Sequence, residues 1–338
     1  MKISQLKENY AELIDDIQGD LDAEFKMVKE FDQAQADDLI YVLNERYLPA
    51  AMDSAAKNIV VLTKLKEQTQ NFENRNLIFS SEAEVLIAKL LQDHYYYESK
   101  ITFPQSNVVI DETAEIAEDV EIGPNTVIGK KVKIQSGTKI GPNNIICDEA
   151  KIGENCFLGA ANYIGKKVEL GNHVKMHSFN CIGTDPFLTS SEYGFVSTAA
   201  GLILEDKVEM GSANTVELGL IQPTIVKTGS KLDNRTFIGC ETILGPHSFL
   251  TAGVKVCHNV VTGHHFVCGG NTTVMPKVNI TDNVQVAGIS VVDKDIKESG
   301  AYGGHPLQTM RDYLKTSMSL SKLANYRKQI QKIIENEK

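Results

Sequence analysis

An aliphatic residue or methionine occupies every sixth position from Ile110 to Ile182 without exception. A shorter series runs from Leu204 to Val216, and a third runs from Val226 to Val286 with Thr262 and Cys268 as its weakest members. A helix repeats every 3.6 residues and a strand every two, so neither needs a period of six. The pattern therefore predicts short strands, each followed by a turn, that wind into a coil.

Each hexad opens with an apolar residue, continues with a small one and ends in turn formers, as in IGPNTV from Ile122 and IGENCF from Ile152. Glycine after the apolar residue, as at Gly123 and Gly153, permits the backbone to bend without crowding. Three hexads close one triangular coil whose first residues all point inward. The three series hold 13, 3 and 11 hexads, which predicts nine coils joined by parallel ladders.

The period is interrupted twice. One interruption is a segment of 20 residues from Thr184 to Ile203, which includes PFLTSSEYGF, and the other adds four residues within Glu217 to Thr224. Excursions from a regular repeat tend to gather on one binding face. We therefore expect both segments to contact substrate.

The chain divides into three segments by pattern. Residues 1–103 lack hexads and alternate helix-like and strand-like stretches, which predicts a small α/β domain. Residues 104–299 form the coil, so the fold class is mainly β, a parallel β-helix. Residues 300–338 begin with a Gly- and Pro-containing turn and continue from Gln308 as an amphipathic helix. Such a helix must pack on something, which favours a helical bundle in a homotrimer.

Composition narrows the function classes. The net charge of −10 argues against a nucleic-acid partner, and no apolar run is long enough to form a transmembrane segment. The charged N-terminus lacks a signal-peptide pattern, so we expect a cytoplasmic protein. Six scattered cysteines without a C-x-x-C pair indicate reduced thiols. The basic tail after Leu307 fits either an acidic partner or a solvated helix face.

Beyond the repeat, several segments resemble one family in order along nearly the whole chain. They are ADDLIYVLNERYL, IGTDPF, LILEDKVEMGSANTVELG, GSKLDN and VAGISVVDKDIKESGAYGGHPLQ. They resemble the UDP-3-O-acylglucosamine N-acyltransferases of lipid A synthesis. The resemblance implies a left-handed coil, a homotrimer, and transfer of a 3-hydroxyacyl group from acyl carrier protein to the 2-amino group of a UDP-linked, 3-O-acylated glucosamine. The C-terminal extension would contact the trimer partners and the carrier protein, and no cofactor is implied.

The resemblance also implies a uridine site in the N-terminal domain, with uracil between two aromatic rings and an Asn at its edge. Tyr41, Asn44 and Tyr47 have the required spacing. Aromatic faces suit a flat heterocycle, and an amide both donates to and accepts from its edge. Alternatively, Tyr41 alternates with Leu39 and Leu43 on a buried strand face while the other two residues form a turn.

Three functional positions depart from the family pattern. Cys240 stands where the resemblance implies the catalytic His, and Lys277 stands where it implies a second, substrate-associated His. Glu217, Leu218 and Gly219 replace an Asp-Arg-Gly sequence. A neutral imidazole can take the proton from the attacking amine, whereas a thiol with a pKa of ~8.5 is a poor base. Cys240 is therefore either a packing residue or, less consistently with its surroundings, an acyl nucleophile.

His258 lies 18 residues after Cys240, and each is the second residue after an inward aliphatic side chain. One coil separates them, so they should stack at one corner. We hypothesise that the base has moved by one coil to His258; the alternative is an ordinary turn histidine. The neighbouring His264, His265 and Cys268 should diverge from it, because successive hexads lie on different faces, so no metal site is predicted.

Two further functions stay open on sequence alone. The first is a related acyltransferase with another donor or sugar acceptor. The second is a non-catalytic protein that binds nucleotide sugar or carrier protein without turnover. Function depends on the site rather than on the fold, so the repeat does not separate these alternatives.

Overall fold

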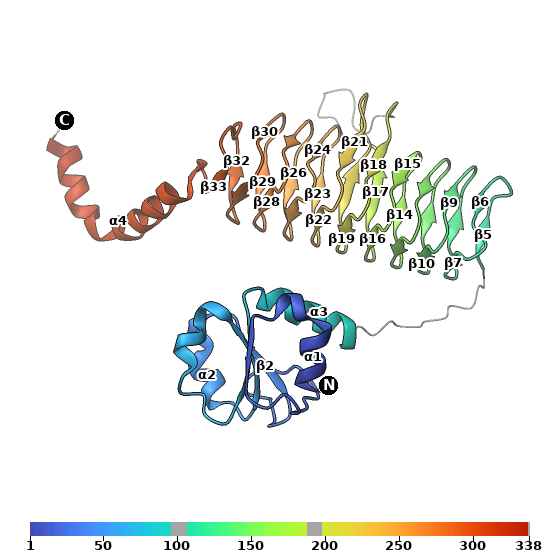
Figure 1. Cartoon of the computed structure of the whole chain (residues 1–338). Coiled ribbons are helices and arrows are strands. Elements are labelled where there is room, and N and C mark those ends of the chain that lie inside the picture. The colour runs from blue at the N-terminus through green and yellow to red at the C-terminus, as the bar shows by residue number, and fades with distance from the viewer. Residues whose placement is uncertain (96–106, 188–197, 337–338) are drawn as a thin grey trace. The chain divides into compact units, whose positions relative to one another are not determined.

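The computed structural model describes residues 1–95, 107–187 and 198–336. The chain forms two compact units, Met1–Ile101 and Thr102–Lys338 (Figure 1). The boundary predicted between residues 103 and 104 lies outside the described residues. Within the described parts, no helix is long and apolar enough to cross a membrane.

The N-terminal unit contains a four-stranded sheet in the order β1-β4-β3-β2, in which β2, β3 and β4 are parallel and β1 is antiparallel to β4. The predicted small α/β region is confirmed, because apolar residues alternate to both faces of β2 and feed two separate hydrophobic clusters. Its elements are α1 (Ile3–Asn9), η1 (Ala11–Leu13), β1 (Asp16–Gln18), β2 (Leu39–Val42), η2 (Glu45–Tyr47), α2 (Leu48–Asp53), β3 (Asn58–Leu62), η3 (Thr63–Thr69), β4 (Asn76–Ser80) and α3 (Ala83–Tyr95).

The hexads form a left-handed parallel β-helix with three sheets, one for each side of the coil (Figure 1). Sheet 1 contains β7 (Glu121–Ile122), β10 (Lys139–Ile140), β13 (Phe157–Leu158), β16 (Lys175–Met176), β19 (Glu209–Met210), β22 (Lys231–Leu232), β25 (Phe249–Leu250), β28 (Val267–Cys268), β31 (Val284–Val286), β33 (Gly300–Gly303) and β34 (Gln308–Thr309).

Sheet 2 contains β5 (Val109–Ile110), β8 (Val127–Ile128), β11 (Ile145–Ile146), β14 (Tyr163–Ile164), β17 (Cys181–Thr184), β20 (Thr215–Glu217), β23 (Phe237–Ile238), β26 (Lys255–Val256), β29 (Thr273–Val274) and β32 (Val291–Val292). Sheet 3 contains β6 (Glu115–Ile116), β9 (Lys133–Ile134), β12 (Lys151–Ile152), β15 (Val168–Leu170), β18 (Leu202–Leu204), β21 (Thr224–Val226), β24 (Ile243–Leu244), β27 (Val261–Thr262) and β30 (Asn279–Ile280).

The second residue of the two-residue strands lies in the core, which confirms the inward prediction. Thr262 and Cys268 are buried with the aliphatic residues. The exceptions among the described two-residue strands are edge strands: Ile110 in β5 is 47% exposed, Ile116 in β6 is half buried and Thr309 in β34 is exposed. The corners between sheets take left-handed backbone even at non-glycine residues, such as Asn125 and Asn143, which is a conformation that asparagine tolerates.

A ladder of buried asparagines lines one edge of the coil. The Asn162 amide N–H donates to Asn144 Oδ1 at 2.9 Å, and the Asn180 N–H donates to Asn162 Oδ1 at 2.9 Å. The Asn214 N–H and its Nδ2 then donate to Asn180 Oδ1 at 3.0 and 2.9 Å. Each side-chain oxygen therefore satisfies the backbone of the next coil in a place that water does not reach.

The repeat extends past the predicted last hexad. Strand β32 adds one hexad at Val292, and β33 pairs in parallel with β31, so the coil sheets continue beyond residue 299. The predicted terminal helix is confirmed as α4 (Met310–Asn336). It begins two residues later than expected, because Gln308 belongs to β34 and pairs with Gly303.

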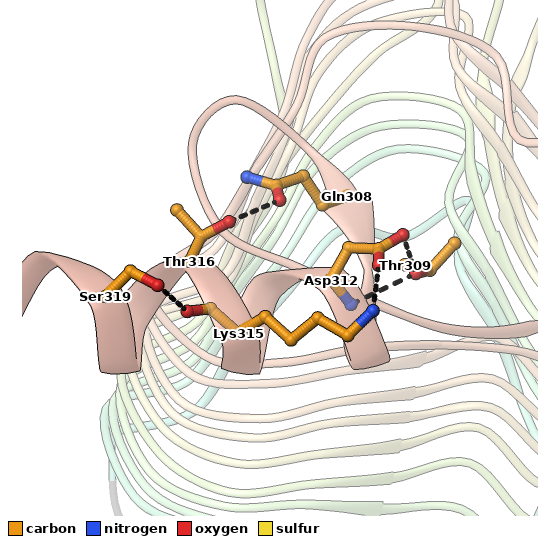
Figure 2. A network of polar contacts seen from close by, with 6 residues as sticks. All are labelled: Gln308, Thr309, Asp312, Lys315, Thr316 and Ser319. Atoms are coloured by element: carbon orange, nitrogen blue, oxygen red, sulfur yellow. Dashed lines mark hydrogen bonds and ion pairs between the residues drawn. The ribbon is translucent and has the colours of Figure 1, made fainter.

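Polar contacts fix the start of α4 (Figure 2). Thr309 Oγ1 donates to Asp312 Oδ2 at 2.9 Å and accepts from the Asp312 N–H at 3.3 Å. Thr316 Oγ1 donates to the Gln308 side chain at 2.9 Å, which ties the helix to the last strand. Apolar side chains further along α4 are exposed in the single chain, namely Leu314, Met318, Leu320, Leu323, Tyr326 and Ile330.

We predict that Asn180→Ala lowers the free energy of unfolding by about 2 kcal/mol or more, because it leaves buried Asn214 donors without an acceptor. Equilibrium denaturation in urea measures the loss. Asn279→Ala is the matched control, because Asn279 is exposed on sheet 3, and it should change stability by less than about 0.5 kcal/mol. Equal losses in the two variants would contradict a structural role for the ladder.

Candidate functional site

The corner that follows sheet 2 brings three of the sequence-predicted residues together. Ile238 pairs with Val256, and the Asn259 N–H donates to the Cys240 carbonyl at 3.0 Å. In the next coil, the Lys277 N–H donates to the His258 carbonyl at 3.1 Å. The predicted stacking of Cys240 and His258 is confirmed, and Lys277 follows one coil further. We call residues 239–241, 257–259 and 275–277 the candidate corner.

Cys240 is only 5% exposed. Burial raises the pKa of its thiol to about 11, and the nearby carboxylates of Glu217 and Glu241 add to that rise. A thiol with this pKa is almost entirely protonated at neutral pH and is a poor nucleophile. The geometry therefore favours the packing interpretation of Cys240 over the nucleophile interpretation.

His258 differs from Cys240 because its side chain is exposed at the same corner. The Glu241 carboxylate reaches the same turn, because its Oε2 accepts from Nδ2 of the adjacent Asn259 at 3.2 Å, and the Glu217 carboxylate reaches the Cys240 N–H one coil away. His258 therefore has the access that a base requires.

Glu217 lies at the end of β20 and is half buried. Burial raises the pKa of its carboxyl group, an effect partly offset by the backbone N–H groups of Cys240 and Phe187 and by His258. Its Oε2 accepts from the Cys240 N–H at 3.0 Å. The family resemblance implies an aspartate at this position, so the change to Glu217 was visible in the sequence. The sequence did not reveal that the Glu217 side chain contacts the next coil.

Glu241 forms hydrogen bonds that hold the four-residue insertion, within residues 217–224, against the candidate corner. Its Oε1 accepts from the Ile221 and Gln222 N–H groups at 2.8 and 3.0 Å, and its Oε2 accepts from Asn259 Nδ2 at 3.2 Å. These donors lower the pKa of the Glu241 carboxyl, the Gln222 backbone having the largest effect. Glu241 was not predicted from the sequence. Its partners lie in an insertion outside the six-residue period, so the period does not indicate which residues they are.

The two interruptions of the period, the first excursion (residues 184–203) and the insertion (residues 217–224), meet beside this corner. The Leu218 N–H donates to the Thr184 carbonyl at 2.9 Å, and the Gly219 N–H donates to the Gly201 carbonyl at 3.1 Å. The insertion is therefore bonded to both ends of the first excursion. Residues 188–197, which include most of the PFLTSSEYGF segment, lie outside the described residues. Within the described parts, both interruptions of the period lie beside the candidate corner.

The predicted uridine residues lie in the N-terminal unit, each with a partner there. Tyr41, in β2, packs half buried against the cluster on one face of the sheet. Tyr47 is 38% exposed and stacks on Phe31 with ring centroids 5.8 Å apart, and Phe31 packs on the opposite cluster. Asn44 Oδ1 caps η2 by accepting from the Arg46 N–H at 3.1 Å. Uridine binding by Tyr41, Asn44 and Tyr47 stays a prediction.

His264 and His265, which follow the candidate corner along the chain, contact one another. His264 Nδ1 lies 3.2 Å from His265 Nδ1, and His264 Nε2 lies 3.0 Å from Asp282 Oδ2. Cys268 points into the core. In the parts of the chain that the structure describes, no group of three His, Cys, Asp or Glu side chains could hold a metal ion.

A hollow of about 500 Å³ lies elsewhere, on sheet 3. Charged side chains line it, including Lys133, Lys151, Glu169 and Glu205. Two of these, Lys151 and Glu169, form an ion pair of 2.7 Å. None of the sequence-predicted site residues borders this hollow, so it does not change the assignment of the candidate corner.

A family model described as the GMPPB C-terminal domain matches residues 104–186. The chain is 32% identical over 157 residues to the UDP-3-O-acylglucosamine N-acyltransferase of Helicobacter hepaticus, covering 44% of this chain and 46% of that protein. It is also 32% identical over 129 residues to the enzyme of the same name from Hahella chejuensis, covering 37% of each chain. The matches span less than half the length of these curated relatives.

Among solved structures, LpxA from Acinetobacter baumannii is 22% identical, with a TM-score of 0.49, and the match covers 61% of this chain and 74% of that one. The UDP-N-acetylglucosamine acyltransferase of Arabidopsis is 18% identical, with a TM-score of 0.49, over 59% of this chain and 70% of that one.

We predict that alkylation distinguishes Cys240 from Cys147. At pH 7, iodoacetamide should label the half-buried Cys147 first and leave Cys240 unmodified in the folded protein. Labelling of Cys240 should accelerate about tenfold per pH unit toward its pKa of about 11, because the thiolate is the reacting form. Peptide mass spectrometry measures both rates. Labelling of Cys240 at pH 7 as fast as Cys147 would contradict the packing role.

We also predict that Glu241→Ala releases the insertion. The Ile221 and Gln222 amides lose their acceptor, so their hydrogen exchange should accelerate at least tenfold. Glu241→Gln is the matched variant, because its remaining carbonyl oxygen can still accept from both amides and should preserve slow exchange. Fast exchange already in the unmodified protein would show that the insertion is not held by Glu241.

Proposed function

We propose that this chain, whose coil is related in sequence to UDP-3-O-acylglucosamine N-acyltransferases of the hexapeptide-repeat family, is itself an acyltransferase. It would move a 3-hydroxyacyl group from acyl carrier protein to the 2-amino group of a UDP-linked, 3-O-acylated glucosamine in lipid A synthesis. The observation that carries the proposal is the candidate corner, where an exposed His258 stands one coil from Cys240 and the carboxylates of Glu217 and Glu241 bond to Cys240 and Asn259.

In the proposed reaction, the sugar amine attacks the thioester carbonyl and a C–N bond forms. The nitrogen becomes cationic and gives a proton to His258 before the C–S bond breaks. The carrier thiol leaves as a thiolate and takes that proton back from the imidazolium. Glu217 and Glu241 stabilise the transient positive charge on His258, since both carboxylates interact electrostatically with it.

Further residues would bind the substrates. Lys277 is exposed one coil beyond His258, so its ammonium group could contact the anionic part of the sugar nucleotide. Tyr41, Asn44 and Tyr47 would hold the uridine, which requires the Phe31–Tyr47 stack to open or to use its exposed face. These contacts follow from the family resemblance.

The partners follow from the same proposal. The exposed apolar side chains of α4 would pack in a homotrimer, and its basic residues would receive the acidic carrier protein. The reaction would take place in the cytoplasm, where the acyl carrier protein supplies the donor.

We predict that His258→Ala lowers kcat at least 100-fold, which is the usual contribution of a general base. Transfer is measured by mass spectrometry of the new amide, with UDP-3-O-acylglucosamine and a panel of acyl carrier proteins and acyl-CoAs. His173→Ala is the control, because His173 is also an exposed histidine at a corner of the coil. Unchanged turnover in His258→Ala would mean that the base has not moved by one coil.

The replacement of the expected base by Cys240 keeps a binding protein as the second candidate function. Retained binding of the UDP-sugar without product from any donor would favour it. Activity with acyl-CoA but not with carrier protein would favour a related transferase.

A further inference from the structure

We infer that His264 and His265 form a binding site for a divalent transition-metal ion such as Zn²⁺, at the corner that follows β27 of sheet 3. The candidate corner follows sheet 2, so this inference does not depend on the proposed acyl transfer. The sequence predicts no metal site here, because it separates these histidines from His258. The pair that the structure shows lies instead within a single corner.

The two imidazole rings meet through the nitrogens that would bind the ion. His264 Nδ1 lies 3.2 Å from His265 Nδ1, and the rings are nearly perpendicular, at 86°, with their centroids 5.1 Å apart. Two nitrogens bound to one zinc ion at about 2.0–2.1 Å in tetrahedral geometry lie about 3.3 Å from each other. The pair therefore already has the spacing of two ligands of one ion.

Hydrogen bonds to the coils on both sides fix the backbone of this corner. The His265 N–H donates to the Pro246 carbonyl at 3.0 Å, and the Asn283 N–H donates to the His264 carbonyl at 2.9 Å. His247, one coil earlier, packs against the His265 ring with the centroids 5.4 Å apart. Two side chains on a fixed backbone lose less entropy when one ion joins them.

Asp282 determines which nitrogen of His264 carries the proton. Its Oδ1 accepts from the His264 backbone N–H at 2.8 Å, and its Oδ2 lies 3.0 Å from His264 Nε2. A carboxylate only accepts, so in the neutral imidazole the hydrogen belongs on Nε2 and Nδ1 keeps its lone pair. Metal-binding histidines commonly donate their second ring N–H to a carboxylate in this way. His264 is therefore oriented as a metal ligand.

A metal ion would replace the proton between the two rings. With a lone pair on His264 Nδ1, the contact of 3.2 Å is a hydrogen bond donated by His265 Nδ1–H. When the ion binds both Nδ1 atoms, that proton moves through solvent to His265 Nε2, and the ring stays neutral. Imidazole nitrogen suits Zn²⁺, Ni²⁺ and Cu²⁺, whereas Mg²⁺ and Ca²⁺ prefer oxygen. Because the described residues contain no group of three metal-binding side chains, water would fill the remaining positions.

Calorimetric titration of the untagged full chain with ZnCl₂ tests the site. We expect one ion per chain, and we expect His264→Ala and His265→Asn each to lower the affinity at least tenfold. Asparagine is chosen at His265 because that residue has a left-handed backbone, which asparagine tolerates. His173→Asn is the matched control, because His173 is an exposed, left-handed histidine at the corresponding position of an earlier coil, and it should leave the affinity unchanged.

Asp282→Asn tests the orientation of His264 separately. The asparagine oxygen can still accept from the His264 backbone N–H, but its Nδ2 then faces His264 Nε2 and donates to it, which moves the ring proton to Nδ1. Nitrogen NMR of the imidazole should show this change of tautomer, and the zinc affinity should fall about tenfold. An unchanged tautomer with unchanged affinity would contradict the role of Asp282 as a positioning residue.

Other outcomes would overturn the metal site itself. One is the absence of zinc binding to the unmodified protein, and another is unchanged affinity in both His264→Ala and His265→Asn. Binding that is lost in His258→Ala but kept in those two variants would place the ion at the candidate corner. Binding of MgCl₂ as tight as that of ZnCl₂ would assign the ion to carboxylates rather than to imidazoles. None of these results depends on whether the chain transfers an acyl group.

Discussion

The parallel hydrogen bonding of each coil on the next is the constraint on which the rest of the molecule depends. The Ile238–Val256 and Val256–Val274 pairs show one fixed offset, so residues that lie 18 apart in an uninterrupted series stack on one another. The aliphatic core cannot hold this offset alone, because apolar contacts have no direction. The buried asparagine ladder adds directional bonds from Asn144 to Asn214, and these continue across the first excursion. A one-residue slip would break them all.

This constraint explains what the sequence could and could not predict. Position within a hexad predicts the buried side of the strands between the ends of the coil and the stacking of Cys240 on His258, because both follow from counting. Counting residues does not predict the structure at the ends of the coil or in the two interruptions of the six-residue period. Ile110 is exposed in the edge strand β5, and Gly300–Gly303 forms a sheet strand although its composition indicates a turn.

The contacts of Glu217 and Glu241 escape prediction for a related reason. Their partners lie in segments that have left the repeat, so no register connects them to the corner. In the N-terminal unit there is no period at all, and the stacking of Tyr47 on Phe31 depends on a tertiary contact between residues 16 positions apart. The sequence therefore predicts the framework of the site more fully than its electrostatics.

Glu217 also shows that the corner is not arranged for stability alone. Its pKa is raised in the folded chain, so the folded state binds the proton more tightly than the unfolded state does. Its contribution to stability is accordingly lost as pH rises through the folded pKa, so ionisation of this carboxyl group is a cost. Glutamine could accept the Cys240 N–H without that cost. What glutamine could not supply is a negative charge beside His258.

The length of that side chain fits the proposed move of the base. Neighbouring coils lie about 4.8 Å apart, so a base that moves from the Cys240 position to His258 leaves an orienting carboxylate one coil too far away. The family resemblance implies the shorter aspartate where Glu217 stands, and the longer side chain of Glu217 bonds to the next coil through the Cys240 N–H at 3.0 Å. Glu241, one coil nearer to His258 than Glu217, adds a second charge. Cys240, which is 5% exposed, is the small buried residue of this corner. The changes at these positions are therefore consistent with one displacement of the site along the coil rather than with independent losses.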